Sequence, residues 1–140
     1  MALYCDSHFY DTYHSFLKKN KTRYVKKCII KKFIDIDVPY NLDFPATDLY
    51  NMRHNENINQ LYLKTRLCSS GDFRVYFLVT KKGDLYLSHL HPKENKGGFS
   101  TYNSDQIKSN LKNLIKAIKT KDKIYKVSIN SKKKFVFSKI

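Results

Sequence analysis

Residues 61–79, LYLKTRLCSSGDFRVYFLV, constrain the fold most, because they hold two alternating apolar and polar patterns around a short turn. Successive side chains of a β-strand point to opposite faces of the sheet. Leu61–Leu67 and Phe73–Thr80 therefore predict two paired strands, each with one apolar face. The turn KKGD, in which Gly83 supplies a positive φ, leads into a third predicted strand, Leu85–His91. The apolar face of such a sheet needs a layer of helix against it.

The opposite face of the two strands carries cations and tyrosines. Its members are Tyr62, Lys64, Arg66, Arg74 and Tyr76. Arginine holds phosphate through two parallel hydrogen bonds, and tyrosine rings give bases a surface for stacking. We interpret this face as a surface for a nucleic-acid strand. The alternative is an ordinary solvated sheet face, on which the same residue types are common.

The N-terminal part of the chain predicts a helical hairpin. Apolar residues recur at helical spacing in two pieces within residues 7–34, with Ser7 and Thr22 as expected N-caps. The segment MALYC before them predicts only a weak strand. Residues 37–60 contain two prolines and five asparagines, which predicts an irregular connection with a helical turn near Thr47–Arg53.

A long amphipathic helix is expected over residues 104–120, followed by a hairpin. The apolar face of this helix consists of Ile107, Leu111, Leu114, Ile115 and Ile118, and the lysine stripe beside it of Lys108, Lys112, Lys116 and Lys119. Ile124–Ile129 and residues 134–137 predict two short strands, added to the sheet or projecting from it. We treat residues 1–140 as one domain, with 121–140 as a C-terminal extension.

The charge of the chain favours a polyanionic partner. The 140 residues include 27 Lys and Arg against 12 Asp and Glu, a net charge of +15. Residues 1–60 hold 9 basic and 7 acidic residues, net +2, so residues 61–140 hold 18 and 5, net +13. Such a field attracts RNA, DNA, an acidic protein or an anionic membrane. A lysine-rich solvated surface is the alternative explanation.

Cysteine usage and hydropathy give an expectation about the compartment. The three cysteines, Cys5, Cys28 and Cys68, are widely spaced and odd in number, which argues against a disulfide scaffold or a zinc site. No signal peptide and no apolar run long enough to span a membrane are recognisable. We therefore expect a cytoplasmic protein without a membrane partner.

The central segment, YLKTRLCSSGDFRVYFLV…KGDLYLSHLHPKENKG, resembles the core of the RelE/ParE superfamily of toxins from bacterial toxin–antitoxin pairs. The family pattern is a basic strand, an SSG turn, and an aromatic residue followed by arginine. Here it reads Lys64-Thr65-Arg66-Leu67, Ser69-Ser70-Gly71 and Phe73-Arg74-Val75. Residues 16–36 are similar to the family's helical hairpin, and the likeness covers about residues 7–119.

This resemblance implies an α+β fold and two alternative targets. The fold is an N-terminal helical hairpin packed on a curved antiparallel sheet, followed here by a C-terminal helix and a short β extension. RelE-type members cut mRNA, usually on the ribosome, and so inhibit translation. ParE-type members inhibit gyrase and cut nothing. Either activity implies a cognate antitoxin that wraps the basic surface. A third possibility is a basic nucleic-acid-binding module with no toxin activity.

A RelE-like endoribonuclease would use no metal. The chain has only two glutamates, Glu56 and Glu94, so it lacks the clustered carboxylates that hold Mg²⁺, and we expect no cofactor. In the metal-independent route a base deprotonates the ribose 2′-hydroxyl, which attacks the adjacent phosphate. Cations stabilise the added charge, and an acid protonates the leaving 5′-oxygen.

The resemblance assigns roles in this route to individual residues. Lys64 and Arg66 occupy the positions of the family's basic pair, with Lys64 as the candidate base, and Arg74 would hold the phosphate. Lys93 lies near the loop position that supplies a further cation or the acid. His89 and His91 are alternative acid–base groups, because imidazole titrates near neutral pH. The predicted RNA-binding residues are Tyr62, Tyr76, Lys96, Lys108, Lys112 and Lys116. His8, His14 and His54 are expected to be structural or surface residues.

Overall fold

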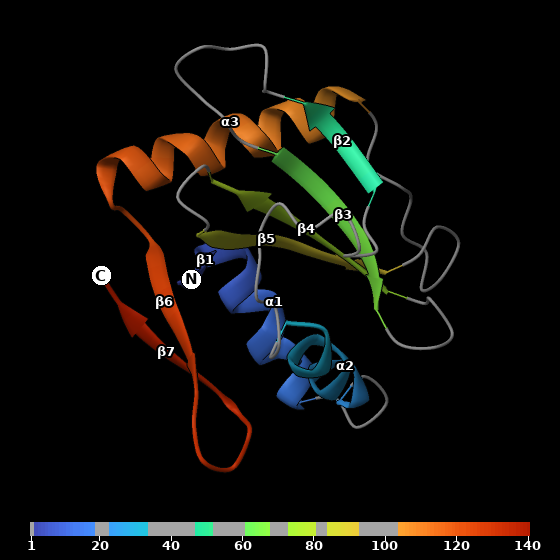
Figure 1. Ribbon diagram of the computed structural model, residues 1–140, viewed down its shortest axis with the longest axis vertical. Helices are drawn as coiled ribbons and strands as arrows, with labels where there is room; N and C mark the ends of the chain where they lie inside the picture. The colour runs from blue at the N-terminus through green and yellow to red at the C-terminus, as the bar shows by residue number, and fades with distance from the viewer. Residues whose placement is uncertain are drawn as a thin grey trace.

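A mixed sheet forms the centre of the protein (Figure 1). The computed structural model describes residues 2–18, 23–33, 47–51, 61–67, 73–80, 84–92 and 104–140. The described residues form helices α1 (Ser7–Lys18), α2 (Tyr24–Phe33) and α3 (Ser104–Thr120), and strands β1 (Leu3–Asp6), β2 (Thr47–Asn51), β3 (Leu61–Leu67), β4 (Phe73–Val79), β5 (Leu85–Pro92), β6 (Ile124–Ile129) and β7 (Phe135–Lys139). The predicted α+β class is confirmed.

The seven strands lie in the order β2-β3-β4-β5-β1-β6-β7. Strand β1 pairs in parallel with β5, and the other pairs are antiparallel. The expectation of a purely antiparallel sheet is therefore wrong. The segment MALYC, predicted as a weak strand, forms β1 inside the sheet. Strands β5 and β6 pair with its two edges, and these pairings stabilise it although it is short.

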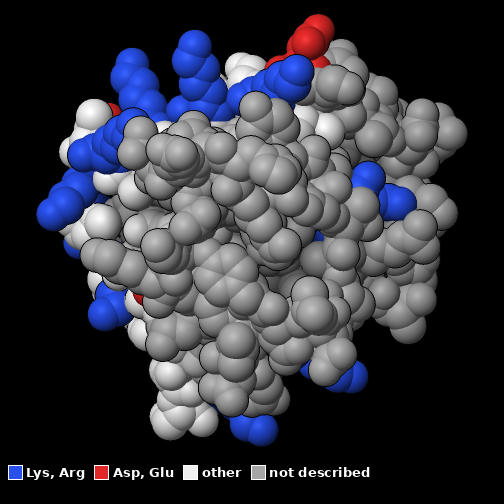
Figure 2. All heavy atoms as spheres, turned by 45° about the horizontal axis from the view of Figure 1, so that its top comes forward, with Lys and Arg blue, Asp and Glu red and all other residues white. Residues whose placement is uncertain are grey.

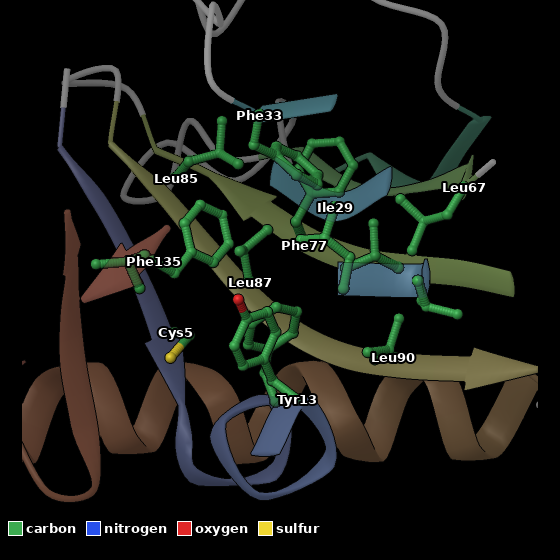
Figure 3. Close-up of a cluster of buried hydrophobic side chains, with 14 of the residues drawn as sticks. Cys5, Tyr13, Ile29, Phe33, Leu67, Phe77, Leu85, Leu87, Leu90 and Phe135 are labelled. Atoms are coloured by element: carbon green, nitrogen blue, oxygen red, sulfur yellow. The ribbon is translucent and has the colours of Figure 1, made fainter. Parts of the chain in front are cut away.

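Helices α1 and α2 cover one face of the sheet. The predicted apolar positions of β3 and β4, such as Leu67 and Phe77, pack against Phe9 of α1 and Ile29 and Phe33 of α2. Figure 3 shows side chains of these helices and of the strands pointing into one shared core. The two helices predicted in the N-terminal region are therefore present, and both pack on this face of the sheet.

Helix α3 covers the opposite face of the sheet (Figure 1). Leu111 and Leu114 are buried there together with Tyr62, Tyr76 and Leu78. The molecule therefore has two cores, one on each side of the sheet. This second core is what the alternation in residues 61–79 did not predict.

Two further expectations about local structure are wrong. Thr47–Asn51, expected as a helical turn, forms edge strand β2, because it pairs with β3. The N-cap of α1 is Asp6 rather than Ser7, since the Phe9 N–H donates to Asp6 Oδ1 at 2.9 Å. The first correction arises from pairing with β3, which a short sequence pattern does not contain, whereas the second rests on a local contact between residues three apart.

Residues 121–140 are an integral part of the sheet. The predicted strands β6 and β7 form, and β6 pairs with β1 over Leu3–Asp6. Val127 and Phe135 are buried in the core beneath α1. The C-terminal extension therefore completes one side of the fold.

The cysteines differ from expectation at one position. Cys5 is a free, buried thiol, and burial raises its pKa above the ordinary value. Cys28 is disulfide-bonded.

The end of α3 offers a test of local strain. The Lys121 N–H bonds the Ile118 carbonyl at 3.3 Å and the Asp122 N–H bonds the Ala117 carbonyl at 3.2 Å, a Schellman motif with Lys121 at φ 53°. Glycine is favoured at this position because it has no Cβ. We expect Lys121→Gly to raise the free energy of unfolding by roughly 0.5–1 kcal/mol. The same change at exposed Lys119, inside the helix, should lower it by roughly 0.5–1 kcal/mol. Urea denaturation of both variants measures the two signs, and equal signs would contradict the strain at Lys121.

Candidate functional site

The predicted catalytic residues lie in two rows across the sheet. Strand pairing sets Lys64 of β3 beside Tyr76 of β4, and Tyr76 beside His89 of β5. The next row joins Arg66, Arg74 and His91 in the same way. Adjacent strands lie about 4.8 Å apart, so each row spans about 10 Å of backbone. The sheet thus brings these predicted residues together.

A β-bulge shapes the end of these rows. Phe77 pairs with Leu87, whereas Tyr76 pairs with His89, which leaves Ser88 as the extra residue on β5. Bulges redirect side chains and occur often beside active sites. Here Ser88 and His89 both reach the carboxyl end of β1, where Asp6 lies.

A polar pocket of about 460 Å³ opens at this corner of the fold. It lies between the junction of β1 with α1, the end of β5, and one side of α3. Its lining residues are Asp6, Ser7, His8, His89, Asn110, Asn113, Lys116, Ala117, Thr120, Asp122 and Lys123. The pocket contains two imidazoles, two carboxylates and two ammonium groups, which is a set suited to proton transfer and anion binding.

Two histidines stack in the pocket. The ring centroids of His8 and His89 lie 4.0 Å apart, with 30° between the ring planes. His91 lies two residues along β5 and is 8% exposed, as is His89. Three imidazoles are therefore gathered around the end of β5.

A chain of hydrogen bonds runs behind His89. The Ser88 hydroxyl donates to Asp6 Oδ2 at 3.0 Å, and Ser88 Oγ lies 2.8 Å from His89 Nδ1. Burial raises the pKa of Asp6 to about 6, although hydrogen bonds from backbone N–H groups and Ser88 oppose that rise. Burial, reinforced by His8 and His91, lowers the pKa of His89 to about 3. The pKa of His8 is lowered as well, chiefly by burial.

These shifts predict acid-induced destabilisation. His89 stays neutral in the folded state down to about pH 3, whereas in the unfolded chain it takes a proton near its ordinary pKa of 6.5. The free energy of unfolding should therefore fall as pH falls from 6.5 toward 3. Asp6 acts in the opposite sense between 3.8 and about 6, because its folded form binds the proton first. Between neutral pH and pH 4, we expect the free energy of unfolding of wild type to fall by about 3 kcal/mol more than that of His89→Gln.

Urea denaturation across this pH range measures the effect. Asp6→Asn provides the matched comparison, because removing the opposing group should make the acid loss larger than in wild type. Identical pH dependence in wild type and His89→Gln would contradict the burial of a neutral imidazole.

Cations border the pocket on two sides. Lys116 and Lys123 line it directly, whereas half-buried Lys64 and Arg74 lie farther along the sheet rows that end at His89 and His91. The exposed lysines Lys108 and Lys112 continue outward along α3. Figure 2 shows Lys and Arg side chains gathered along the edge where α3 lies. A polyanion approaching this side meets positive charge before it reaches the histidines.

The predicted stacking surface is not open to solvent. Tyr62 and Tyr76 are 0% and 1% exposed, because α3 packs on them. The expectation that their rings present a platform to bases is therefore wrong. A tyrosine is as compatible with a second helical layer as with a wet face, since its ring is apolar and its hydroxyl polar.

Several predicted residues fall outside the described part of the chain. They are Lys93 and Lys96, together with His54. Arg66 lies on β3 at its predicted register, but its side chain is outside the described atoms.

The sequence reasoning missed Asp6, His8 and Lys123, which line the pocket, and Ser88, which lies behind it on Asp6 and His89. His8 was expected to be structural, yet it stacks on His89. A usable signal was the pair Asp6 and His8 at a strand-to-helix junction. Side chains at such a junction lie at the edge of the sheet, next to the ends of neighbouring strands. His14, by contrast, packs among Tyr10, Tyr13 and Phe137, as a structural residue would.

The described residues contain no group of three or more His, Cys, Asp or Glu side chains arranged to hold a metal ion. In the same part of the chain, no helix has the length and apolar character to cross a membrane. Comparison with protein-family models, with curated proteins and with solved structures finds no match to this chain.

Proposed function

We propose that this protein is an endoribonuclease that cleaves RNA without a metal ion, by attack of a ribose 2′-hydroxyl on the adjacent phosphate. The observation that carries the proposal is the pocket in which His8 and His89 stack, at the end of a sheet row that begins at Lys64. Imidazoles supply acid and base, and the neighbouring cations suit a phosphate that gains charge.

The steps of the reaction are divided among residues of the pocket and of the sheet rows that end beside it. His89 takes the proton of the 2′-hydroxyl, and the oxygen bonds to phosphorus. Arg74, with Lys64 and Lys116, stabilises the added negative charge. The His8 imidazolium donates a proton to the leaving 5′-oxygen as the P–O5′ bond breaks. The products are a 2′,3′-cyclic phosphate and a 5′-hydroxyl end.

Because the pKa values of both histidines are lowered, this division of labour requires the bound substrate to favour a proton on the pair. In the empty pocket both imidazoles are neutral, because burial and mutual proximity disfavour the charged form. A bound phosphate favours an imidazolium beside it, so substrate raises the pKa of the histidine it touches. The pair is then set to hold one proton between them, as the reaction requires. Lys64, assigned as the base by family resemblance, is better placed as a charge that holds RNA.

The RelE/ParE resemblance extends this proposal to a biological role. In that role the protein is the toxin of a toxin–antitoxin pair, cleaves mRNA on the ribosome in the cytoplasm, and is held inactive by an antitoxin bound over the basic surface. The helical hairpin on one face of the sheet and the arginine on β4 support it. The buried tyrosines and the helix α3 over the basic face direct RNA toward the pocket rather than over an open sheet.

Induced expression in bacteria tests the role. We expect growth arrest with new 5′ ends on a reporter mRNA, mapped by primer extension, and loss of both with Arg74→Ala or Lys64→Ala. Arrest that persists in the variants, with mRNA intact, would replace the proposal with gyrase inhibition. Absence of arrest with soluble protein confirmed would leave a nucleic-acid-binding module and remove the toxin role.

A further inference from the structure

We propose that Asp6 acts through Ser88 to set which ring nitrogen of His89 carries the proton, so that the carboxyl group switches His89 between proton acceptor and proton donor. The proton arrangement is a property of the pocket alone, whereas its catalytic consequence rests on the proposed RNA cleavage. Asp6 is in this account a positioning residue.

The three groups form one continuous chain across two strands. Asp6 ends β1 and Ser88 occupies the bulge of β5, and their side chains meet at 3.0 Å although 82 residues separate them. Ser88 Oγ is also 2.8 Å from His89 Nδ1. The side chain of Ser88 is fully buried, so it serves as a link between the two groups rather than as a nucleophile exposed to substrate.

The number of available protons defines two hydrogen-bonding arrangements of Asp6, Ser88 and His89. A hydroxyl donates only one hydrogen, and an ionised carboxylate donates none. When Asp6 is ionised, Ser88 donates to Asp6, so His89 Nδ1–H must donate to Ser88 and Nε2 is the nitrogen without a proton. When Asp6 is protonated, its O–H donates to Ser88, Ser88 donates to Nδ1, and the proton of neutral His89 lies on Nε2. The two states differ by one proton, on Asp6.

The order of the two pKa values sets the direction of proton transfer along the hydrogen bonds from His89 to Asp6. The pKa of Asp6 is raised to about 6 and that of His89 lowered to about 3, so a proton taken up by Nε2 is held more strongly on the carboxylate. As Nε2 takes the 2′-hydroxyl proton, Nδ1–H passes to Ser88 and the Ser88 proton passes to Asp6. His89 ends the step neutral, with its proton on Nε2. This ordering is the reverse of the ordinary values, in which histidine is the stronger base.

Other ionisable groups face this chain and are left unchanged by the test. They are His8 and Asp11 on α1, His91 on β5, Arg74 on β4, Lys116 on α3, and Asp122 and Lys123 in the turn after α3. Their charges shift the pH at which the switch occurs. They do not alter which nitrogen of His89 faces Ser88.

Asp6→Asn is the decisive variant because the fold orients its amide. Oδ1 of residue 6 accepts the Phe9 N–H, so the asparagine oxygen is retained there and its NH₂ group occupies the position of Oδ2. Asparagine is as good an N-cap as aspartate, so α1 keeps its cap. The NH₂ group donates to Ser88, which then donates to Nδ1. The variant should hold His89 with its proton on Nε2 at every pH.

Long-range proton–nitrogen correlation spectra of protein with nitrogen-15-labelled histidine measure the tautomer directly, with His89→Gln to assign the signal. In wild type we expect the Nδ1–H form well above the Asp6 pKa of about 6 and the Nε2–H form below it. Asp6→Asn should show Nε2–H throughout. In Ser88→Ala the His89 tautomer should no longer follow the titration of Asp6.

His14 serves as an internal standard. Its Nδ1 lies 2.7 Å from the Tyr10 carbonyl, which only accepts, so its proton stays on Nδ1. One His89 tautomer in wild type and Asp6→Asn at all pH values would overturn the proposal.

Measurement of RNA cleavage separates this proposal from the proposed function. If RNA is cleaved, Asp6→Asn should slow cleavage by about 10- to 100-fold and remove the dependence of rate on pH near 6. A tautomer switch in a protein that cleaves no RNA would keep the proton chain and reject the ribonuclease. Cleavage of RNA without a tautomer switch would keep the ribonuclease and reject the proton chain.

Discussion

His89→Gln should reduce RNA cleavage by about 10²- to 10⁴-fold, the range expected on removal of one acid–base group. Glutamine retains much of the volume and the hydrogen-bonding capacity of histidine but does not take up a proton near neutral pH. His8→Gln should have an effect of the same order, because the proposed mechanism gives His8, which lies against His89, the role of the acid in the same step. Initial rates on a fluorescent RNA oligonucleotide, with programmed ribosomes present and absent, measure the loss.

The matched control is His14→Gln. His14 lies on the same helix as His8 but contacts Tyr10 and Phe137, away from the pocket. Its replacement should leave the rate within a few-fold of wild type. Equal losses of activity for His14→Gln and His8→Gln, or full activity of His89→Gln with an unchanged melting temperature, would contradict the proposed catalytic role of the pocket.

Removal of residues 121–140 should abolish folding. Strand β6 covers one edge of β1, and the segment buries Ile124, Val127 and Phe135. Burial of a large apolar side chain contributes about 1.5–3 kcal/mol, so three of them approach the whole stability of a domain, about 5–15 kcal/mol. We expect the chain 1–120 to lose its cooperative thermal transition by circular dichroism.

A matched pair of valines tests the same packing without truncation. Val127 on β6 is 4% exposed and Val136 on β7 is 41% exposed. Val127→Ala should lower the free energy of unfolding by about 1–3 kcal/mol, and Val136→Ala by at most about 0.5 kcal/mol. A cooperatively folding 1–120 chain, together with equal effects of the two valines, would show that the segment is an appendage.

The strands and helices were largely predictable because their patterns are local. Leu61–Leu67 and Phe73–Val79 alternate, and Ser104–Thr120 repeats at helical spacing, so each pattern lies within one element. The layer above the tyrosines was not predictable from alternation, because Tyr62 and Tyr76 suit a wet face and a buried one equally. The apolar stripe of α3 indicated this second layer, since such a stripe needs a surface to pack against.

The candidate site, which is the pocket together with the sheet rows that end beside it, was only half predictable. The basic strand pattern and the histidines of β5 pointed to Lys64, Arg74, His89 and His91. Asp6 and His8 lie about 80 residues earlier, on a strand too short to be recognised as central. Their place beside Ser88 depends on the parallel pairing of β1 with β5, which no local pattern specifies. The bulge at Ser88 is equally invisible in the sequence, because it is defined by the register with β4.

The most direct test of the central claim is the chemistry of the RNA ends. The purified protein would be incubated with a defined mRNA, with and without ribosomes, and the products identified by mass spectrometry. Attack by the 2′-hydroxyl predicts 2′,3′-cyclic phosphate and 5′-hydroxyl ends, absent from reactions with His89→Gln. Intact RNA under both conditions, or products with 3′-hydroxyl and 5′-phosphate ends, would contradict it.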